Sequence, residues 1–148
     1  MPTDQAITTL NQLIAIAVDG VAGFRLAADR AEDPRLKALF AQLATDRQAV
    51  VAALQGVVRR RGGEPEDEGT FSGSAHRAFT SLKAAITDTD RTGLLNEVER
   101  GESYAVEQFE EALRRGDLPP EARTVIQTQL AEVRRSRDRV TAMNRIKS

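Results

Sequence analysis

The chain has 148 residues, a hydrophobic share of 41% and a formal net charge of −1, which is the profile of one soluble globular domain with one core. It contains no cysteine, so a disulfide framework, a thiolate metal site and a cysteine nucleophile are excluded. The near-neutral charge balance gives no electrostatic drive toward nucleic acid or an anionic membrane. Ala, Leu, Arg and Glu dominate the composition, and these residues favour helix over strand.

The first predicted helix spans residues 4–31. Its apolar residues recur at steps of three and four, which places them on one stripe of the helix. Thr3 is the expected N-cap. Gly20 and Gly23 lie inside the helix, where each costs about 1 kcal/mol relative to alanine. One explanation is that a neighbouring helix approaches closely at these glycines and offsets the cost. The other is that the cost is not compensated.

The second predicted helix spans residues 34–61. Asp33 is a good N-cap, and Pro34 suits the first helical position because its missing N–H is not needed there. Basic residues fill the last turn, and Gly62 and Gly63 supply a left-handed cap. Because the link to the first helix is very short, the two helices are expected to form an antiparallel hairpin.

A polar crossover follows, roughly residues 63–90. It contains a short amphipathic helix, predicted at residues 74–86. His76, which is the one histidine of the chain, flanks the apolar face of this helix. We interpret it as a surface or interface histidine.

Two further long helices are predicted at residues 91–115 and 119–146. Gly116 ends the first of them, and Pro119 with Pro120 begins the second. Their tight link indicates a second antiparallel hairpin. The sequence therefore predicts a single all-α domain over residues 1–148, a four-helix bundle whose two antiparallel hairpins are joined by a long crossover containing a short helix.

Four polar residues fall on the inward faces of these helices when successive residues are placed 100° apart. They are Arg47, Glu102, Gln129 and Ser136. A lone buried charge costs several kcal/mol, so charged core positions are expected to be paired. We predict a buried or half-buried ion pair between Arg47 and Glu102, with Gln129 as a candidate third member.

This polar cluster has two interpretations. In the first it fixes the register and orientation of the helices. In the second it is a reduced metal or ligand site, in which Asp46, Glu99, Glu102 and Glu132 supply oxygen ligands to iron or manganese. The acid-x-x-His spacing of di-metal bundles is absent from the second and fourth helices, and Arg47 would repel a cation. We therefore expect no metal cofactor and no catalytic residue, with the iron or manganese site as the alternative.

Ile16 and Leu26 lie well away from the inner stripe of the first helix. They need cover from the crossover helix or from a second subunit, and a two-fold homodimer is the commonest arrangement. The start of the chain has no basic region before its apolar residues, and no uninterrupted apolar run approaches the about 20 residues of a membrane span. We expect a cytoplasmic protein that binds neither membrane nor nucleic acid.

Four segments resemble those of small bacterial four-helix-bundle proteins, a ferritin-like domain of unknown function: residues 33–40 (DPRLKALF), 61–65 (RGGEP), 99–102 (ERGE) and 117–121 (DLPPE). The resemblance extends over residues 10–140. It implies a ferritin-like fold, a bacterial cytoplasmic setting and no established activity. Some relatives in the wider superfamily are linked to stress, and some bind two metals.

Three functions follow as hypotheses. The first is a non-enzymatic bundle that acts through self-association or a protein partner, with a link to stress. The second is a metal-binding ferritin-like protein that uses the four acids named above. The third is a carrier of a small hydrophobic ligand between its helices, which predicts a continuous apolar cavity.

Overall fold

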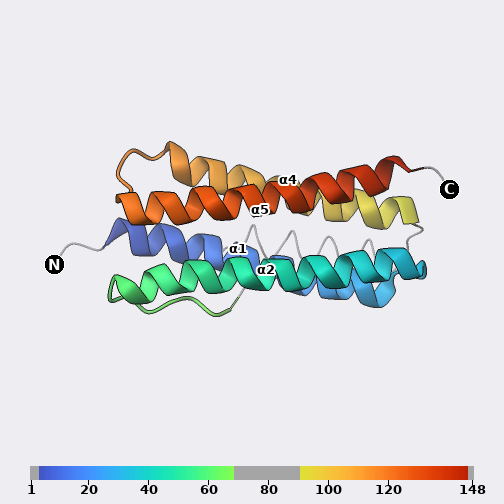
Figure 1. The fold of residues 1–148 in the computed structure, drawn as a ribbon, viewed down its shortest axis with the longest axis horizontal. Helices are drawn as coiled ribbons and strands as arrows, with labels where there is room; N and C mark the ends of the chain where they lie inside the picture. Colours follow the sequence, from blue (N-terminus) through green and yellow to red (C-terminus); the bar gives the residue numbers. More distant parts are fainter. Residues whose placement is uncertain (1–3, 69–90, 147–148) are drawn as a thin grey trace.

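The computed structural model describes residues 4–68 and 91–146, and these form four long α-helices (Figure 1). They are α1 (Gln5–Arg30), α2 (Pro34–Arg60), α4 (Arg91–Arg114) and α5 (Pro120–Arg145). No strand occurs in this part of the chain. The predicted all-α class with four long helices is confirmed over these residues. The helix predicted at residues 74–86, with His76, lies outside them.

Two hairpins lie side by side with their helices along a common direction (Figure 1). One hairpin is α1 with α2, and the other is α4 with α5. Between the hairpins, α1 packs on α4 and α2 packs on α5. The helices α2 and α4 therefore stand on a diagonal of the bundle, and only long side chains can join them.

The helix ends are fixed by side-chain caps and by glycine. The carboxylate of Asp4 accepts hydrogen bonds from the backbone N–H groups of Ala6 and Ile7, so Asp4 is the N-cap of α1 and the prediction of Thr3 was wrong. Asp33 caps α2 as predicted, by accepting from the N–H of Arg35 at 2.8 Å. After α2, Gly62 adopts a φ of +81°, the left-handed conformation that glycine tolerates best.

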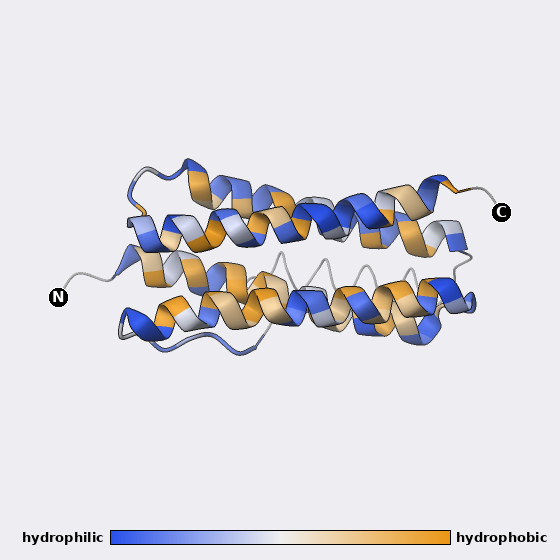
Figure 2. Cartoon of the chain, in the orientation of Figure 1, coloured by the Kyte–Doolittle hydropathy of each residue, from blue (hydrophilic) through white to orange (hydrophobic). Residues whose placement is uncertain are grey.

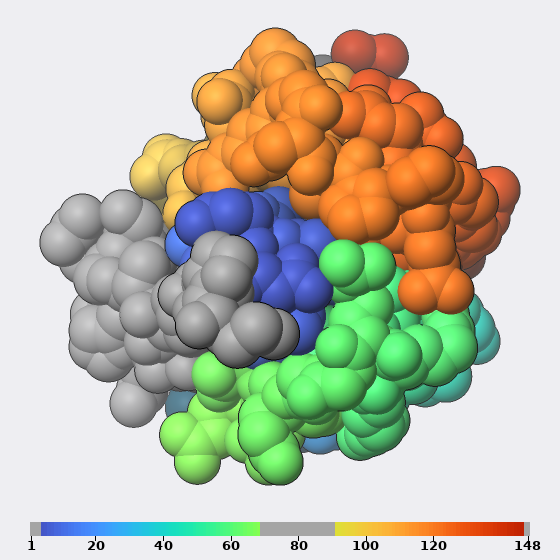
Figure 3. Space-filling model, turned by 90° about the vertical axis from the view of Figure 1, so that its left-hand side faces the viewer, coloured from blue at the N-terminus to red at the C-terminus, as the bar shows by residue number. Residues whose placement is uncertain are grey.

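The apolar residues form two clusters, one toward each end of the bundle. The larger cluster contains Leu10, Leu54 and Phe109, all at most 1% exposed. Figure 3 looks onto this end, where the start of α1 (blue) is enclosed between the end of α2 (green) and the α4–α5 hairpin (orange). In the smaller cluster, Phe24 and Phe40 stack with ring centroids 6.5 Å apart.

The boundary between the clusters falls at mid-bundle on every helix. Along α2 the smaller cluster ends at Ala44 and the larger one begins at Val50. Figure 2 shows hydrophilic residues at this level of the helices, between apolar stretches on either side. The core is thus two apolar regions with a polar layer between them. Among the described residues the polar layer interrupts the apolar core along the bundle axis, which is where the ligand-carrier hypothesis would need a continuous cavity.

Helix α1 is the most apolar of the four. By length and composition alone it could cross a membrane, because it contains an 18-residue window that is strongly apolar. Half of that window is buried against the rest of the bundle, as expected of a core helix. Ile16 and Leu26 are half-buried, since they pack against the larger and the smaller cluster respectively.

Candidate functional site

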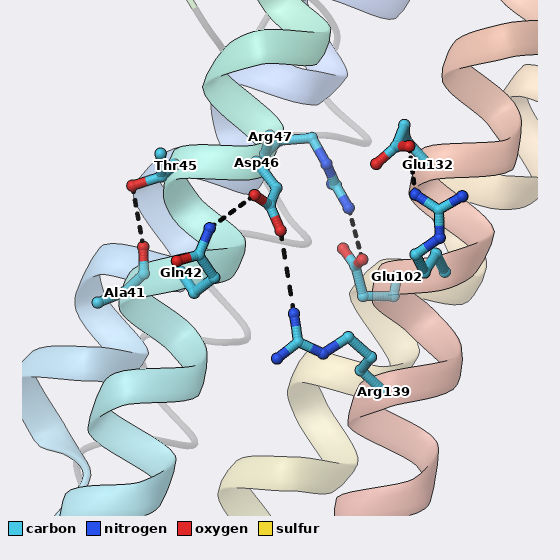
Figure 4. A network of polar contacts seen from close by, with 9 residues as sticks. Ala41, Gln42, Thr45, Asp46, Arg47, Glu102, Glu132 and Arg139 are labelled. Atoms are coloured by element: carbon cyan, nitrogen blue, oxygen red, sulfur yellow. Dashed lines mark hydrogen bonds and ion pairs between the residues drawn. The ribbon is translucent and has the colours of Figure 1, made fainter.

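The centre of the bundle holds an ion pair between α2 and α4. Nη2 of Arg47 donates a hydrogen bond to Oε2 of Glu102 over 2.5 Å, and the two side chains point toward one another across the diagonal (Figure 4). The side chains are only 2% and 5% exposed. A guanidinium suits this position because its long stem spans the bundle while its charge meets a carboxylate.

Helix α1 completes the setting of the guanidinium. The ring of Phe24 lies under Arg47, with the guanidinium carbon 5.2 Å from the ring centroid, which adds a cation–π attraction. A Cβ atom at Gly20 would lie 2.7 Å from Nη1 of Arg47. Glycine at this position is therefore explained, because any larger residue would occupy the path of the arginine side chain.

The ion pair forms the central polar layer together with Ser136 of α5. On α4, Glu102 falls between Val98 of the smaller cluster and Ala105 of the larger one. Ser136 is 5% exposed and takes the same intermediate position on α5. One polar side chain on each of α2, α4 and α5 thus lies between the two apolar clusters at the same level.

Two opposing effects act on the carboxyl group of Glu102. Burial raises its pKa above the ordinary value, because an ionised carboxylate loses its hydration in the core. The charge and the hydrogen bond of Arg47 act on the pKa in the other direction. The net direction is upward, so folding favours the protonated form of Glu102 relative to the unfolded chain.

The other three acids proposed as metal ligands do not join Glu102. Asp46 accepts a hydrogen bond from Gln42 at 2.8 Å and lies 4.0 Å from Arg139 (Figure 4). Glu132 pairs with Arg135 on the same helix. Both side chains are partly exposed at the α2–α5 edge, 36% for Asp46 and 42% for Glu132, whereas Glu102 is 5% exposed.

Glu99 accepts a hydrogen bond from Asn144 of α5 over 3.1 Å. Over residues 4–68 and 91–146, no three His, Cys, Asp or Glu side chains come together in a way that could hold a metal ion. Of the four acids, the structure therefore brings only Glu102 to the bundle centre, and there it faces a cation.

Gln129, the candidate third member of the ion pair, lies elsewhere in the structure. It is 9% exposed and lines an open groove of about 450 Å³ between the end of α2 and the start of α5. Its amide makes no hydrogen bond to Arg47 or Glu102 within the described residues. The groove is lined by Val57, Arg60, Pro120, Glu121, Thr124, Val125, Thr128 and Gln129.

Sequence reasoning missed this groove and the ring beneath Arg47. Helical periodicity assigns Phe24 to the apolar stripe of α1, and its contact with the guanidinium depends on the angle between two helices. The groove lies between Val57 of α2 and Val125 of α5, near one end of the bundle. Neither feature has a signal in the spacing of residues along one helix.

Comparison with known proteins gives one family. Residues 5–115 match a family described as "Domain of unknown function (DUF2383)". The match covers α1, α2 and α4 and includes both members of the ion pair. No curated protein matches the chain.

Proposed function

The chain belongs to the DUF2383 family, a domain of unknown function, and we propose that it is a non-enzymatic helical bundle that acts by association with itself or with a protein partner. In this proposal the bundle centre is a structural element. The chemistry that serves function lies on the outer faces of the helices.

The carrying observation is the position of the Arg47 guanidinium. Di-metal bundles gather about four carboxylates and two histidines at mid-bundle to neutralise their cations. Here the one carboxylate that is buried among the described residues, Glu102, is neutralised by an arginine 2.5 Å away. A divalent cation entering this site would be repelled by Arg47 and would have one acidic ligand, which supports a structural role for the pair.

A ferritin-like fold remains part of the proposal. Two tight hairpins joined by a long connection, with charged residues at the middle of the bundle, are the features that support it. A bacterial cytoplasmic setting and a link to stress rest on the resemblance of the sequence segments. The burial of half of the apolar window of α1 supports a core helix in preference to a membrane span.

The alternative function is an atypical iron or manganese site built on Glu102. The observation in its favour is a carboxylate that is buried at mid-bundle, which is where di-metal bundles place their metal ligands. Metal binding at this site requires Arg47 to leave the core and the surface acids Asp46, Glu99 and Glu132 to give up their present partners. Several ion pairs and hydrogen bonds would be exchanged for coordination bonds.

Two measurements on the full chain test the proposal. Elemental analysis of protein purified without added chelator is expected to give much less than one iron, manganese or zinc per chain. The solution mass is expected to exceed that of one chain. Stoichiometric metal that is lost in Glu102→Ala, and also in the nearly isosteric Glu102→Gln, would overturn the proposal in favour of the metal site.

A further inference from the structure

We propose that the self-association surface is the α2–α5 face, and that Ile146 of a second copy fills the groove at the start of α5. This inference rests on the proposed function, because it names the surface through which the bundle associates. It derives from one exposed apolar side chain, one open groove and the spacing of charges between them.

Ile146 is the apolar side chain that lacks cover. At 51% exposed, it is the exposed large hydrophobic residue among those that the structure describes. Its backbone is held in place, because Nη1 of Arg91 donates to its carbonyl oxygen over 3.2 Å. Nη2 of the same arginine donates to the carbonyl of Met143, also over 3.2 Å. The isoleucine is thus presented outward by a fixed helix end, which lowers the entropy lost on binding.

The groove combines apolar walls, which suit an isoleucine side chain, with polar groups, which suit the polar residues around it. Val57, Pro120 and Val125 supply aliphatic walls. The amide of Gln129, a residue about nine-tenths buried, lines the same hollow and has no hydrogen-bond partner among the described residues. Removing an unpaired amide from water costs free energy, so an incoming polar group that satisfies it would add to affinity. The ion pair of Arg60 with Glu121 lies at the exposed rim.

The exposed stripe of α5 gives the register of the second copy. At 100° per residue, Thr128 and Ile146 have the same azimuth, and Glu121, Glu132, Arg135 and Arg139 fall within about 40° of it. In the proposed dimer, two α5 helices pair antiparallel about a two-fold axis, with Ile146 of one copy level with Glu121 of the other. This arrangement fixes the offset between the two helices along their length. That offset sets Glu132 of each copy opposite Arg135 of the other.

This charge pattern is self-complementary. Each α5 carries its acid on one side of the axis and its arginine on the other, so a two-fold pairing makes two attractive contacts and no repulsive one. The same register brings Arg139 of the second copy level with Thr128 and next to Gln129, where the guanidinium can donate to the free amide oxygen. A parallel pairing would place like charges together.

The first test uses one charge at the isoleucine. Ile146→Asp is compared with Ser103→Asp, which adds the same charge at an exposed position of α4, away from the proposed face. By sedimentation equilibrium of the full chain, Ile146→Asp is expected to raise the dimer dissociation constant about tenfold or more, whereas Ser103→Asp leaves it within about twofold. Circular dichroism checks that both variants keep their helix content.

The outcomes separate this inference from the function on which it rests. A dimer that survives Ile146→Asp unchanged overturns the assigned surface but leaves self-association intact. A wild-type chain that stays monomeric at millimolar concentration overturns the inference and self-association together, and the groove is then open to a different protein.

The second test reads the register. Glu132→Arg is expected to weaken the dimer about tenfold, because it sets two arginines opposite one another. Adding Arg135→Glu restores attraction in the double variant, both within α5 and across the axis, and recovers most of the affinity. A matched reversal away from the surface, Arg100→Glu on α4, should have little effect. Failure of the double variant to recover, in chains of unchanged helix content, would overturn the antiparallel register.

Discussion

The two apolar clusters and the central polar layer are stabilised by different interactions. In the clusters, residues such as Leu54 and Phe109 each stabilise the fold in proportion to the apolar area they bury, and each packs against many neighbours. In the polar layer, Arg47 and Glu102 depend on one partner each, because a buried charge is tolerated only while it is paired. The clusters therefore stabilise the bundle through the apolar area they bury, and the polar layer is stable only while its two charges stay paired.

The largest difference between the polar layer and the apolar clusters is expected when one buried charge loses its partner. Arg47→Met keeps a long side chain but removes the cation, so Glu102 faces an apolar core. We expect a loss of about 3–5 kcal/mol in the free energy of unfolding, measured by urea denaturation. A loss below about 1 kcal/mol would show that the pair is not buried in solution.

The matched control removes both charges. Arg47→Met with Glu102→Leu should recover most of the lost stability, since no unpaired group is left. In the larger cluster, Leu54→Ala should cost about 2–5 kcal/mol through the cavity it leaves. Because many neighbours share that loss, Glu102→Leu should not recover it. If Glu102→Leu recovers stability in the Arg47→Met variant but not in the Leu54→Ala variant, the polar layer behaves differently from the apolar clusters.

A pair of glycines sharpens the same comparison. In a helix interior, Gly→Ala ordinarily stabilises by about 1 kcal/mol. A Cβ atom added at Gly101 on α4 would have nothing within 4 Å, so Gly101→Ala is expected to follow this rule. At Gly20 the added methyl would meet Nη1 of Arg47 at 2.7 Å, so Gly20→Ala is expected to destabilise by about 1–3 kcal/mol.

The Gly20 penalty should depend on the arginine. In an Arg47→Met with Glu102→Leu background, the flexible methionine can move aside, and Gly20→Ala should become neutral or stabilising. Thermal unfolding of each background with and without Gly20→Ala gives the comparison. A Gly20→Ala variant as stable as Gly101→Ala in the wild-type background would contradict the packing of Arg47 over α1.

The smallest expected effect is the pH dependence that Glu102 alone contributes. Because burial raises its pKa in the folded state, its contribution to stability is greatest below the ordinary glutamate pKa. That contribution is lost as the pH rises through the raised value. The wild type should therefore gain stability relative to Glu102→Gln as the pH falls from neutral toward about 4. A relative loss on acidification would mean that Arg47 outweighs burial and lowers the pKa.

Much of the bundle could be predicted from the sequence because its signals are local. Helix ends at Asp33 and Gly62 follow from capping chemistry, and the inward positions of Arg47 and Glu102 follow from helical periodicity within one helix. Both polar residues interrupt an apolar stripe, and a cross-helix pair is the way to satisfy them. The cap of α1 was misplaced because Thr3 and Asp4 are both good caps, and the sequence leaves a helix end uncertain by a residue.

What escaped prediction depends on the angle and offset between helices. The edge acids Asp46 and Glu132 are within reach of the centre by azimuth, but Arg139 and Arg135 attract them to the surface. The inward azimuth of Gln129 suggests a place in the ion pair. Its height along α5 puts it instead in the groove between the end of α2 and the start of α5.

The most direct test of the central claim is a titration of the isotopically labelled full chain with Mn²⁺, followed by NMR. The paramagnetic ion broadens signals of nuclei close to it. We predict that no signal broadens selectively at one Mn²⁺ per chain, and that the broadening at higher concentration, beside exposed acids such as Asp46, is the same in Glu102→Gln. Selective broadening of the backbone amides of Arg47 and Glu102 at stoichiometric Mn²⁺, abolished by Glu102→Gln, would contradict an arginine-closed bundle centre and establish a metal site in its place.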